Sequence, residues 1–271
     1  MVSYSKNAVF QYQNYKQSFY EEAKILMKCS SCPNIISAFD LFEENSTVYL
    51  VTELLEGITL QHYLFRQKEP LAEPKIIYMT LEVLNALSFL HHIGYLHLDI
   101  SDDNIFITSS GKVKLIDFGS AAAQAADNHV FASKSIILKI HYAPPEQYQS
   151  DGLIGAWTDL YALGAVMYEA VTKIKVTGAM ERIHKDDMGS PKQINSRISD
   201  RLDFIIRKAL ALNAKDRFQS AEEFRDSIII RNDLVHVGSM LYNNTISICM
   251  KIIGFVCLII CCILGLLWIN R

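Results

Sequence analysis

A polar loop between two apolar segments limits the folds open to this chain more than any other part of its sequence. Before the loop, Ile77 to Leu90 places apolar residues at helical spacing, and Pro74 suits the start of that helix. After the loop, Ile105–Ile107 and Val113–Ile116 flank the turn Ser109-Ser110-Gly111 and predict a short hairpin. With a small sheet before this unit and helices after it, the order predicts an α+β fold.

The remaining elements follow from periodicity and from residues that break the chain. The apolar runs Ile35–Phe42 and Thr47–Thr52, which flank a polar turn, predict a hairpin. The other helices that we expect are Ser18–Lys28, Leu60–Arg66, a mostly apolar helix from Thr158 to Val171, Asp200–Leu212 and Ser220–Arg231.

Composition excludes several classes of protein. Half of the residues are hydrophobic and 20% are charged, so the chain can bury a core and is not globally disordered. Its net charge is −3 and it has no basic run, which argues against a nucleic-acid partner.

Cys29 and Cys32 have the spacing of a redox or zinc pair. Zinc needs about four ligands and no second Cys/His pair stands nearby, so two ordinary thiols are expected.

The C-terminal end has the character of a membrane segment. Ile252–Ile269 is an uncharged run of 18 residues. As a helix it spans roughly 27 Å, close to the hydrocarbon thickness of a bilayer, and Trp268 stands where an interfacial ring belongs. A buried core helix is the alternative, but the run is apolar on every face. We therefore predict a transmembrane helix at 247–269 after a linker at 232–246, and the polar N-terminus predicts no signal peptide.

Three short motifs carry the chemistry. They are His97-Leu98-Asp99-Ile100-Ser101-Asp102-Asp103-Asn104 in the loop, Asp117-Phe118-Gly119 after the hairpin, and Tyr142-Ala143-Pro144-Pro145-Glu146 further on. Each motif alone is weak, but all three in this order around the hairpin are specific. On these residues the chain resembles the protein kinase family, and within it the bacterial Hanks-type Ser/Thr kinases.

The resemblance covers about residues 18–231 and rests on further stretches. They are Glu22-Ala-Lys-Ile-Leu, Pro33-Asn-Ile-Ile, Leu115-Ile-Asp-Phe-Gly, Ala143-Pro-Pro-Glu-Gln-Tyr148, Trp157-Thr-Asp-Leu-Tyr-Ala-Leu-Gly164 and Asp216-Arg-Phe-Gln-Ser-Ala221. It implies a two-lobe kinase domain at 1–231, with an N-lobe remnant at about 1–56 and a complete helical C-lobe at about 57–231. ATP and Mg²⁺ as cofactors, and a protein substrate, follow from the same resemblance.

The resemblance also implies catalytic roles. Asp99 orients the acceptor hydroxyl and takes its proton, while Asn104 and Asp117 are the expected magnesium ligands. Phe118 packs beneath the site and Gly119 gives the loop its freedom. Taken singly, Asp99, Asn104 and Asp117 could be turn formers, but that alternative does not explain the joint pattern.

Further residues fall into a nucleotide-binding set and a structural set. Glu22 resembles the helix glutamate that pairs with a strand lysine, although a solvated carboxylate is the alternative. The expected hinge beside the adenine is Thr52, Glu53 and Leu55, and Phe106 lines the adenine floor or is plain core. Structural roles are expected for His97 and for Asp159, which holds the catalytic loop, and an ion pair is expected between Glu146 and Arg217.

Three departures from the family pattern stand out. No Gly-rich loop precedes Glu22, the first glycine is Gly57, and no apolar strand ends in a lysine there, so a shortened N-lobe or a misassigned start is expected. Leu98 replaces an arginine that reads a phosphorylated activation loop. Ser101 replaces a lysine that touches the γ-phosphate, and we expect Lys139 to supply the missing positive charge.

Three functions remain open on the sequence. The first is a membrane-anchored Ser/Thr protein kinase whose catalytic domain faces the cytoplasm, where ATP is found. The second is a pseudokinase scaffold or gene fragment, favoured by the missing strands and by Leu98 and His141. The third is a small-molecule phosphotransferase, against which the Ala-Pro-Pro-Glu element and Arg217 argue.

Overall fold

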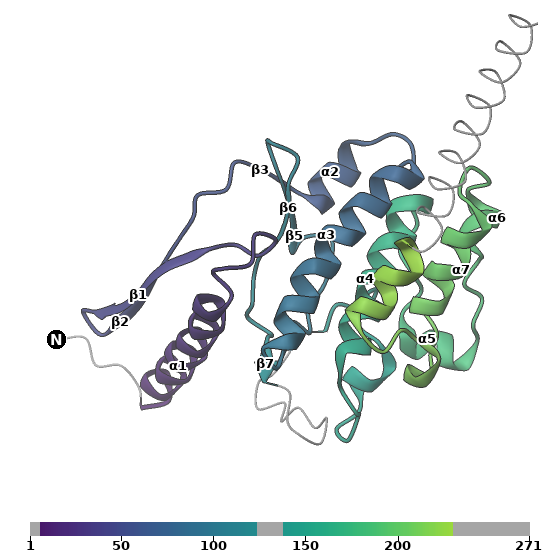
Figure 1. Cartoon of the computed structure of the whole chain (residues 1–271). Coiled ribbons are helices and arrows are strands. Elements are labelled where there is room, and N and C mark those ends of the chain that lie inside the picture. The colour runs from purple at the N-terminus through teal and green to yellow at the C-terminus, as the bar shows by residue number, and fades with distance from the viewer. Residues whose placement is uncertain (1–5, 124–137, 230–271) are drawn as a thin grey trace, which may run out of the picture. The chain divides into compact units, whose positions relative to one another are not determined.

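The computed structural model describes residues 6–123 and 138–229, with side chains from residue 12 onward. The chain divides into two units, 1–225 and 226–271, and the elements that follow belong to the first. They form a small helix-and-hairpin part and a larger, mainly helical part (Figure 1).

The small part consists of α1 (Lys6–Lys28) and the antiparallel hairpin of β1 (Ala38–Glu44) and β2 (Thr47–Thr52). The turn residues Asn45 and Ser46 both have positive φ, 48° and 60°, as a two-residue hairpin turn requires. The hairpin was therefore predicted correctly, although its first strand begins at Ala38 rather than Ile35. Ile35 instead makes an isolated bridge to Leu115.

Helix α1 begins earlier than predicted, at Lys6 rather than Ser18. The added turns of α1 are held by contacts with the hairpin. Contacts between segments this far apart in the chain cannot be predicted from the local sequence of the helix. The Tyr12 hydroxyl lies 3.1 Å from both Ser46 O and Thr47 Oγ1, and Lys16 forms an ion pair with Glu43.

A second sheet pairs β3 (Gly57–Thr59), β5 (Ile105–Thr108) and β6 (Val113–Leu115) in the order β3-β5-β6. A further ladder joins β4 (Tyr95–Leu96) to β7 (Ala122–Ala123). Gly57 has φ 151° and lies so close to β5 that an added Cβ would stand 2.1 Å from Ile107 O. Only glycine fits at this crossing.

The larger part is built from helices and two 3₁₀ turns around one core. They are α2 (Leu60–Arg66), α3 (Glu73–His92), η1 (Pro145–Tyr148), α4 (Ala156–Thr172), α5 (Ala179–His184), α6 (Pro191–Ile194), α7 (Asp200–Ala209) and η2 (Ala214–Asp216), and residues 221–225 are helical again. Helix α4 packs against α3 and α7 and buries 14 of its 17 residues, so it is the centre of this part.

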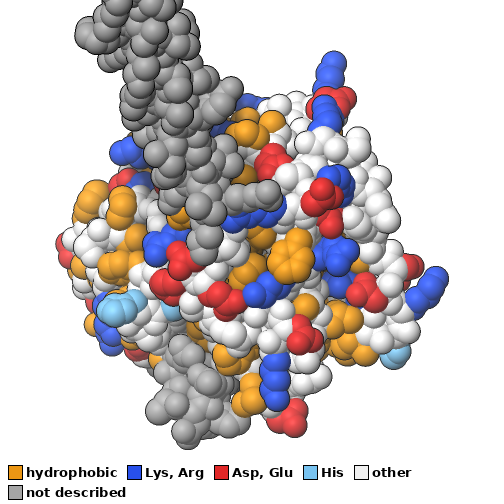
Figure 2. All heavy atoms as spheres, turned by 45° about the vertical axis from the view of Figure 1, so that its right-hand side comes forward, with side chains coloured by type: hydrophobic (Ala, Val, Ile, Leu, Met, Phe, Trp, Pro, Cys, Tyr) orange, Lys and Arg blue, Asp and Glu red, His pale blue; other side chains and the backbone are white. Residues whose placement is uncertain are grey.

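The predicted membrane helix at 247–269 and its linker at 232–246 lie outside the described residues. Among residues 6–123 and 138–229, no helix has the length and apolar character needed to cross a bilayer. On the face shown in Figure 2, acidic and basic side chains are interspersed rather than gathered into a patch of one sign.

Gly57 gives a direct test of the β3–β5 crossing. Gly57→Ala should lower the free energy of unfolding by about 3 kcal/mol, because the new methyl group meets Ile107 O and the backbone angle is strained. Gly111→Ala is the matched control: φ there is 83°, but an added Cβ meets nothing within 4 Å, so about 1 kcal/mol is expected. Equal losses in urea titrations of the two variants would contradict the close approach.

Candidate active site

The loop from His97 to Asn104 is held by a buried carboxylate from α4. Asp159 accepts hydrogen bonds from the backbone N–H of His97 at 2.9 Å and of Leu98 at 2.7 Å, and its Oδ2 lies 2.8 Å from His91 Nε2. Leu98 has φ 63°, a left-handed conformation that a branched side chain rarely adopts. The two bonds to the loop backbone fix this strained turn where the catalytic motif begins.

The charge states around this loop are set by burial and hydrogen bonding. Burial alone raises the pKa of Asp159, but the hydrogen bonds from His91 and the His97 backbone more than offset it and hold the pKa below its ordinary value. Burial lowers the pKa of His97, whose ring packs against Phe118 at 4.9 Å between centroids. The loop is therefore supported by an ionised aspartate and a neutral histidine.

The Leu98 side chain adds an apolar contact to the loop. Its side chain is buried with Leu96 and Ile154, and Ala122 packs against the same small cluster. Where the kinase pattern has an arginine, this chain therefore makes an apolar contact.

Asp99 and Asn104 are brought together as predicted, and Lys139 joins them. Asn104 Nδ2 donates to Asp99 O at 2.9 Å and to Asp99 Oδ2 at 2.8 Å. Lys139 Nζ lies 3.1 Å from Asp99 Oδ2 and donates to Ser101 Oγ at 2.7 Å. Burial raises the pKa of Asp99 above its ordinary value, although Lys139 opposes the shift.

Asp117, Phe118 and Gly119 meet Glu22 from α1. Asp117 has φ 64°, and its Oδ1 accepts from Gly119 N at 3.0 Å. A Cβ built on Gly119 would stand 3.2 Å from Asp117 Oδ1 and 3.6 Å from Glu22 Oε2, so both carboxylates flank this glycine. Phe118 is buried, and its ring packs against His97. Glu22, 95 residues earlier than Asp117, therefore belongs to the same site.

The predicted hinge follows β2, but its glutamate also has a structural partner. The Glu53 side chain forms an ion pair with Lys114, and its backbone N–H donates to Ser37 O at 2.9 Å. Thr52 and Leu55 are half-buried on either side of this residue. Phe106 lies opposite Thr59, and its ring would meet a Cβ on Gly57 at 2.8 Å. The adenine-binding roles assigned to these residues stay predictions.

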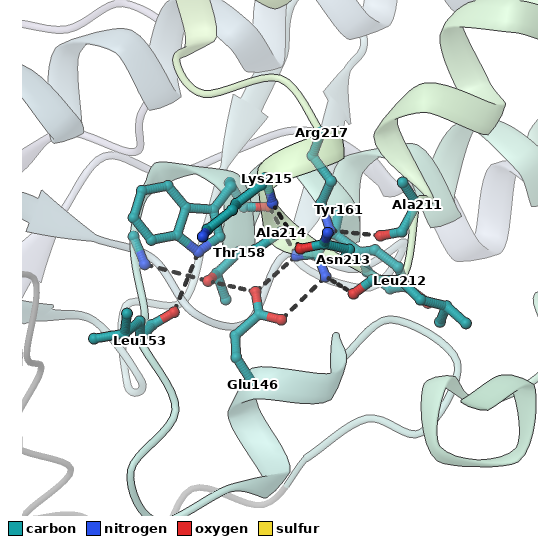
Figure 3. A network of polar contacts seen from close by, with 12 residues as sticks. Glu146, Leu153, Thr158, Tyr161, Ala211, Leu212, Asn213, Ala214, Lys215 and Arg217 are labelled. Carbon is teal, nitrogen blue, oxygen red and sulfur yellow. Dashed lines mark hydrogen bonds and ion pairs between the residues drawn. The ribbon is translucent and has the colours of Figure 1, made fainter. Parts of the chain in front are cut away.

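Glu146 and Arg217 form the expected ion pair, and both are buried (Figure 3). The pair is bidentate, with Arg217 Nη1 and Nη2 at 2.7 and 3.0 Å from the two oxygens of Glu146. Thr158 also donates to Glu146, and the remaining Arg217 donors reach the carbonyls of Ala211 and Leu212. Every charge in this pair is therefore compensated, which a buried pair requires.

Two site residues were missed from sequence. His91 follows Leu84 and Leu87 on the buried stripe of α3, so a polar residue at that spacing was the available signal. Lys114, the partner of Glu53, is a buried lysine in the short strand β6, and no local pattern identified its partner.

The Cys29 and Cys32 pair has the environment of ordinary buried thiols. Burial raises the pKa of the Cys29 thiol to about 12 and also raises the pKa of Cys32. A redox or metal site needs the thiolate, which this environment disfavours. In the part of the chain that the structure describes, no group of three or more His, Cys, Asp or Glu side chains is placed to hold a metal ion.

The arrangement of loop, hairpin and buried ion pair is that of a protein kinase. The family model described as protein kinase domain matches residues 5–228. The chain belongs to the protein kinase family, and its relatives place it with the bacterial Hanks-type Ser/Thr branch.

Three relatives illustrate this similarity. The chain is 32% identical to the serine/threonine-protein kinase PknB of Mycobacterium leprae over 208 residues, covering 73% of this chain and 33% of the relative. It is 31% identical to PrkC of Bacillus subtilis over 203 residues, covering 72% and 31%. The solved structure of PpkA-294 in its apo form matches with a TM-score of 0.71 at 31% identity, covering 83% of this chain and 78% of that one. The matched region spans about a third of the length of these two curated relatives.

The buried ion pair should be costly to break. Arg217→Met should destabilise the protein by about 3–5 kcal/mol, because Glu146 would stay buried without its partner. Lys185→Met, which breaks an exposed contact with Asp187 at 3.8 Å, is the control and should leave the unfolding midpoint unchanged. Equal midpoints for Arg217→Met and the wild type would show that the pair contributes nothing.

The low pKa of Asp159 predicts a pH-dependent effect. A carboxylate whose pKa is lower in the folded state stabilises the fold above its unfolded pKa, and loses this contribution as pH falls through the folded value. Asp159→Asn should therefore cost about 3 kcal/mol at pH 7, and the gap from wild type should close only below about pH 4. Urea titrations from pH 7 to pH 3 measure it, and a gap that stays constant to pH 3 would contradict the assignment.

Proposed function

We propose that this chain is a Ser/Thr protein kinase that transfers the terminal phosphoryl group of ATP to a protein hydroxyl. The observation that carries the proposal is the Asp99–Asn104 pair on a strained loop fixed by Asp159. Asp159, Asp117 and Lys139 all lie close enough to the buried His97 for their charges to act on it. A site of this kind positions reactants and compensates phosphate charge, which is what phosphoryl transfer needs.

The residues fit a magnesium ion. Mg²⁺ prefers oxygen ligands, and Asn104 and Asp117 are the proposed donors. Because Asn104 Nδ2 is engaged by Asp99, its carbonyl oxygen is the atom that can face a cation. Asp117 is exposed and uses one carboxylate oxygen for Gly119 N, so the other can face the phosphates. Bound magnesium would neutralise charge on the phosphates.

In the proposed reaction, the acceptor hydroxyl donates a hydrogen bond to Asp99. Its oxygen forms a bond to the γ-phosphorus, and the bond from that phosphorus to the β–γ bridging oxygen breaks, leaving ADP. The hydroxyl proton passes to Asp99 and then to solvent. Burial, which raises the pKa of Asp99, favours this acceptance of a proton.

A membrane location is part of the proposal. We infer that residues 247–269 anchor the chain and that the kinase domain lies in the cytoplasm, where ATP is available. The support is the uncharged run from Ile252 to Ile269, long enough to span a bilayer.

A catalytically inactive scaffold is the second candidate, favoured by one observation. Residues 6–21, immediately before Glu22, are helical, so a strand lysine for Glu22 cannot come from this segment. The buried Glu146–Arg217 pair supports a peptide-binding segment in either case, and so argues against a small-molecule phosphotransferase.

Nucleotide binding and transfer separate these candidates. ATP at 100 times its Kd should stabilise the full chain by about 2.7 kcal/mol in the presence of magnesium, and Asp117→Asn should abolish that shift. The full chain should then phosphorylate Ser and Thr in a peptide library at a rate that Asp99→Asn lowers about a thousandfold. A folded wild-type protein that shows no magnesium-dependent shift would favour the scaffold.

A further inference from the structure

Lys139 is held by three side chains of the catalytic loop. Its ammonium lies 2.7 Å from Ser101 Oγ, 2.7 Å from Asp103 Oδ1 and 3.1 Å from Asp99 Oδ2. Burial lowers the pKa of Lys139, but the hydrogen bonds and charges of Asp103 and Asp99 more than offset it, so the amine stays protonated. This cation therefore lies beside the carboxylate that would accept the hydroxyl proton.

The lysine comes from a different segment than the groups that hold it. It stands three residues before Tyr142, at the start of the segment that ends at Glu146. The backbone N–H groups of Tyr142 and Ala143 both donate to Lys139 O at 2.9 Å, and Gln147 Nε2 donates to Leu98 O at 3.0 Å. These hydrogen bonds fix the position of the segment 139–146, and so the range of positions that the Lys139 ammonium can occupy.

The distances place this ammonium near the reacting atoms. An acceptor hydroxyl bound to Asp99 Oδ2 would lie about 3 Å from that oxygen, so the hydroxyl and the ammonium would be within roughly 6 Å of each other. Negative charge on the transferring phosphoryl group is spread over its equatorial oxygens. A lysine has a flexible stem with three donors, and the side chain of Lys139 is 30% exposed, so it can turn toward those oxygens.

We propose that Lys139 is a catalytic residue whose ammonium contacts the transferring phosphoryl group, and that the peptide-binding segment, rather than the catalytic loop, delivers this cation. The inference rests on the proposed kinase function and deepens it. Lys139 keeps its proton throughout, since the hydroxyl proton goes to Asp99 and the leaving oxygen departs with ADP. Transfer then requires the segment from Lys139 to Glu146 to be docked, so substrate binding and charge stabilisation depend on one element.

The test compares charge at three positions in the full chain. The variants are Lys139→Met, Lys139→Arg, the double variant Ser101→Lys with Lys139→Met, and the control Lys175→Met. Lys175 also lies beside the loop, 4.0 Å from Asp102 Oδ2, and is 41% exposed. Each protein is assayed for kcat and KM with Mg-ATP and with an acceptor peptide selected from the Ser/Thr library, after circular dichroism has shown that it is folded.

Lys139→Met should lower kcat about 100-fold with little change in the KM for ATP, because the contact is made in the transition state. Lys139→Arg should keep part of the rate. The kcat of the double variant should be at least about tenfold higher than that of Lys139→Met. Ser101 Oγ lies 2.7 Å from the Lys139 ammonium, so a lysine at position 101 can place its own ammonium in the same region.

Several results would overturn the proposal. One is a kcat for Lys139→Met within about threefold of wild type, and another is an equal loss in Lys175→Met, which would point to general charge rather than position. The proposal would also be overturned if Lys139→Arg and the folded double variant were both as slow as Lys139→Met. A wild-type protein that binds Mg-ATP but phosphorylates no peptide would end the proposed function, and this role of Lys139 with it.

Discussion

The hydrogen bonds to Asp159 are the interaction on which the rest of the site depends. A carboxylate that is 1% exposed is costly to bury, and three donors from α3 and the loop compensate it. Because two of those donors are consecutive backbone N–H groups, the carboxylate fixes the direction in which the chain enters the loop. The left-handed turn at Leu98 and the position of Asp99 both follow from that direction.

Helix α4 uses neighbouring residues for two separate tasks. Asp159 holds the catalytic loop, while Thr158, the residue before it, donates to Glu146 in the buried ion pair. The loop that would carry the base and the segment that would carry the substrate are therefore positioned from one helical turn. Since α4 is almost entirely buried, that turn is a rigid reference for both.

Much of this arrangement could be predicted from the sequence, because short motifs encode it directly. Asp99 with Asn104, and Glu146 with Arg217, lie together as their patterns indicated. The start of α1 was predicted wrongly because Tyr12 and Lys16 are polar, and only contacts with a hairpin about 30 residues away explain the added turns. Lys114 was missed for the same reason, since its partner Glu53 is 61 residues distant in the chain. Long-range pairs of this kind leave no local pattern.

The apolar contact at Leu98 has a consequence for how the loop responds to its surroundings. A cation at this position would attract a phosphate placed nearby, and that attraction would weaken as salt is added. Leu98, packed with Leu96 and Ile154, carries no charge that salt could screen or that a phosphate could bind. Its contribution scales with buried area, so it should persist across ionic strength and be indifferent to phosphate on neighbouring residues. At this one position, apolar packing rather than phosphate-dependent electrostatics determines the conformation of the loop.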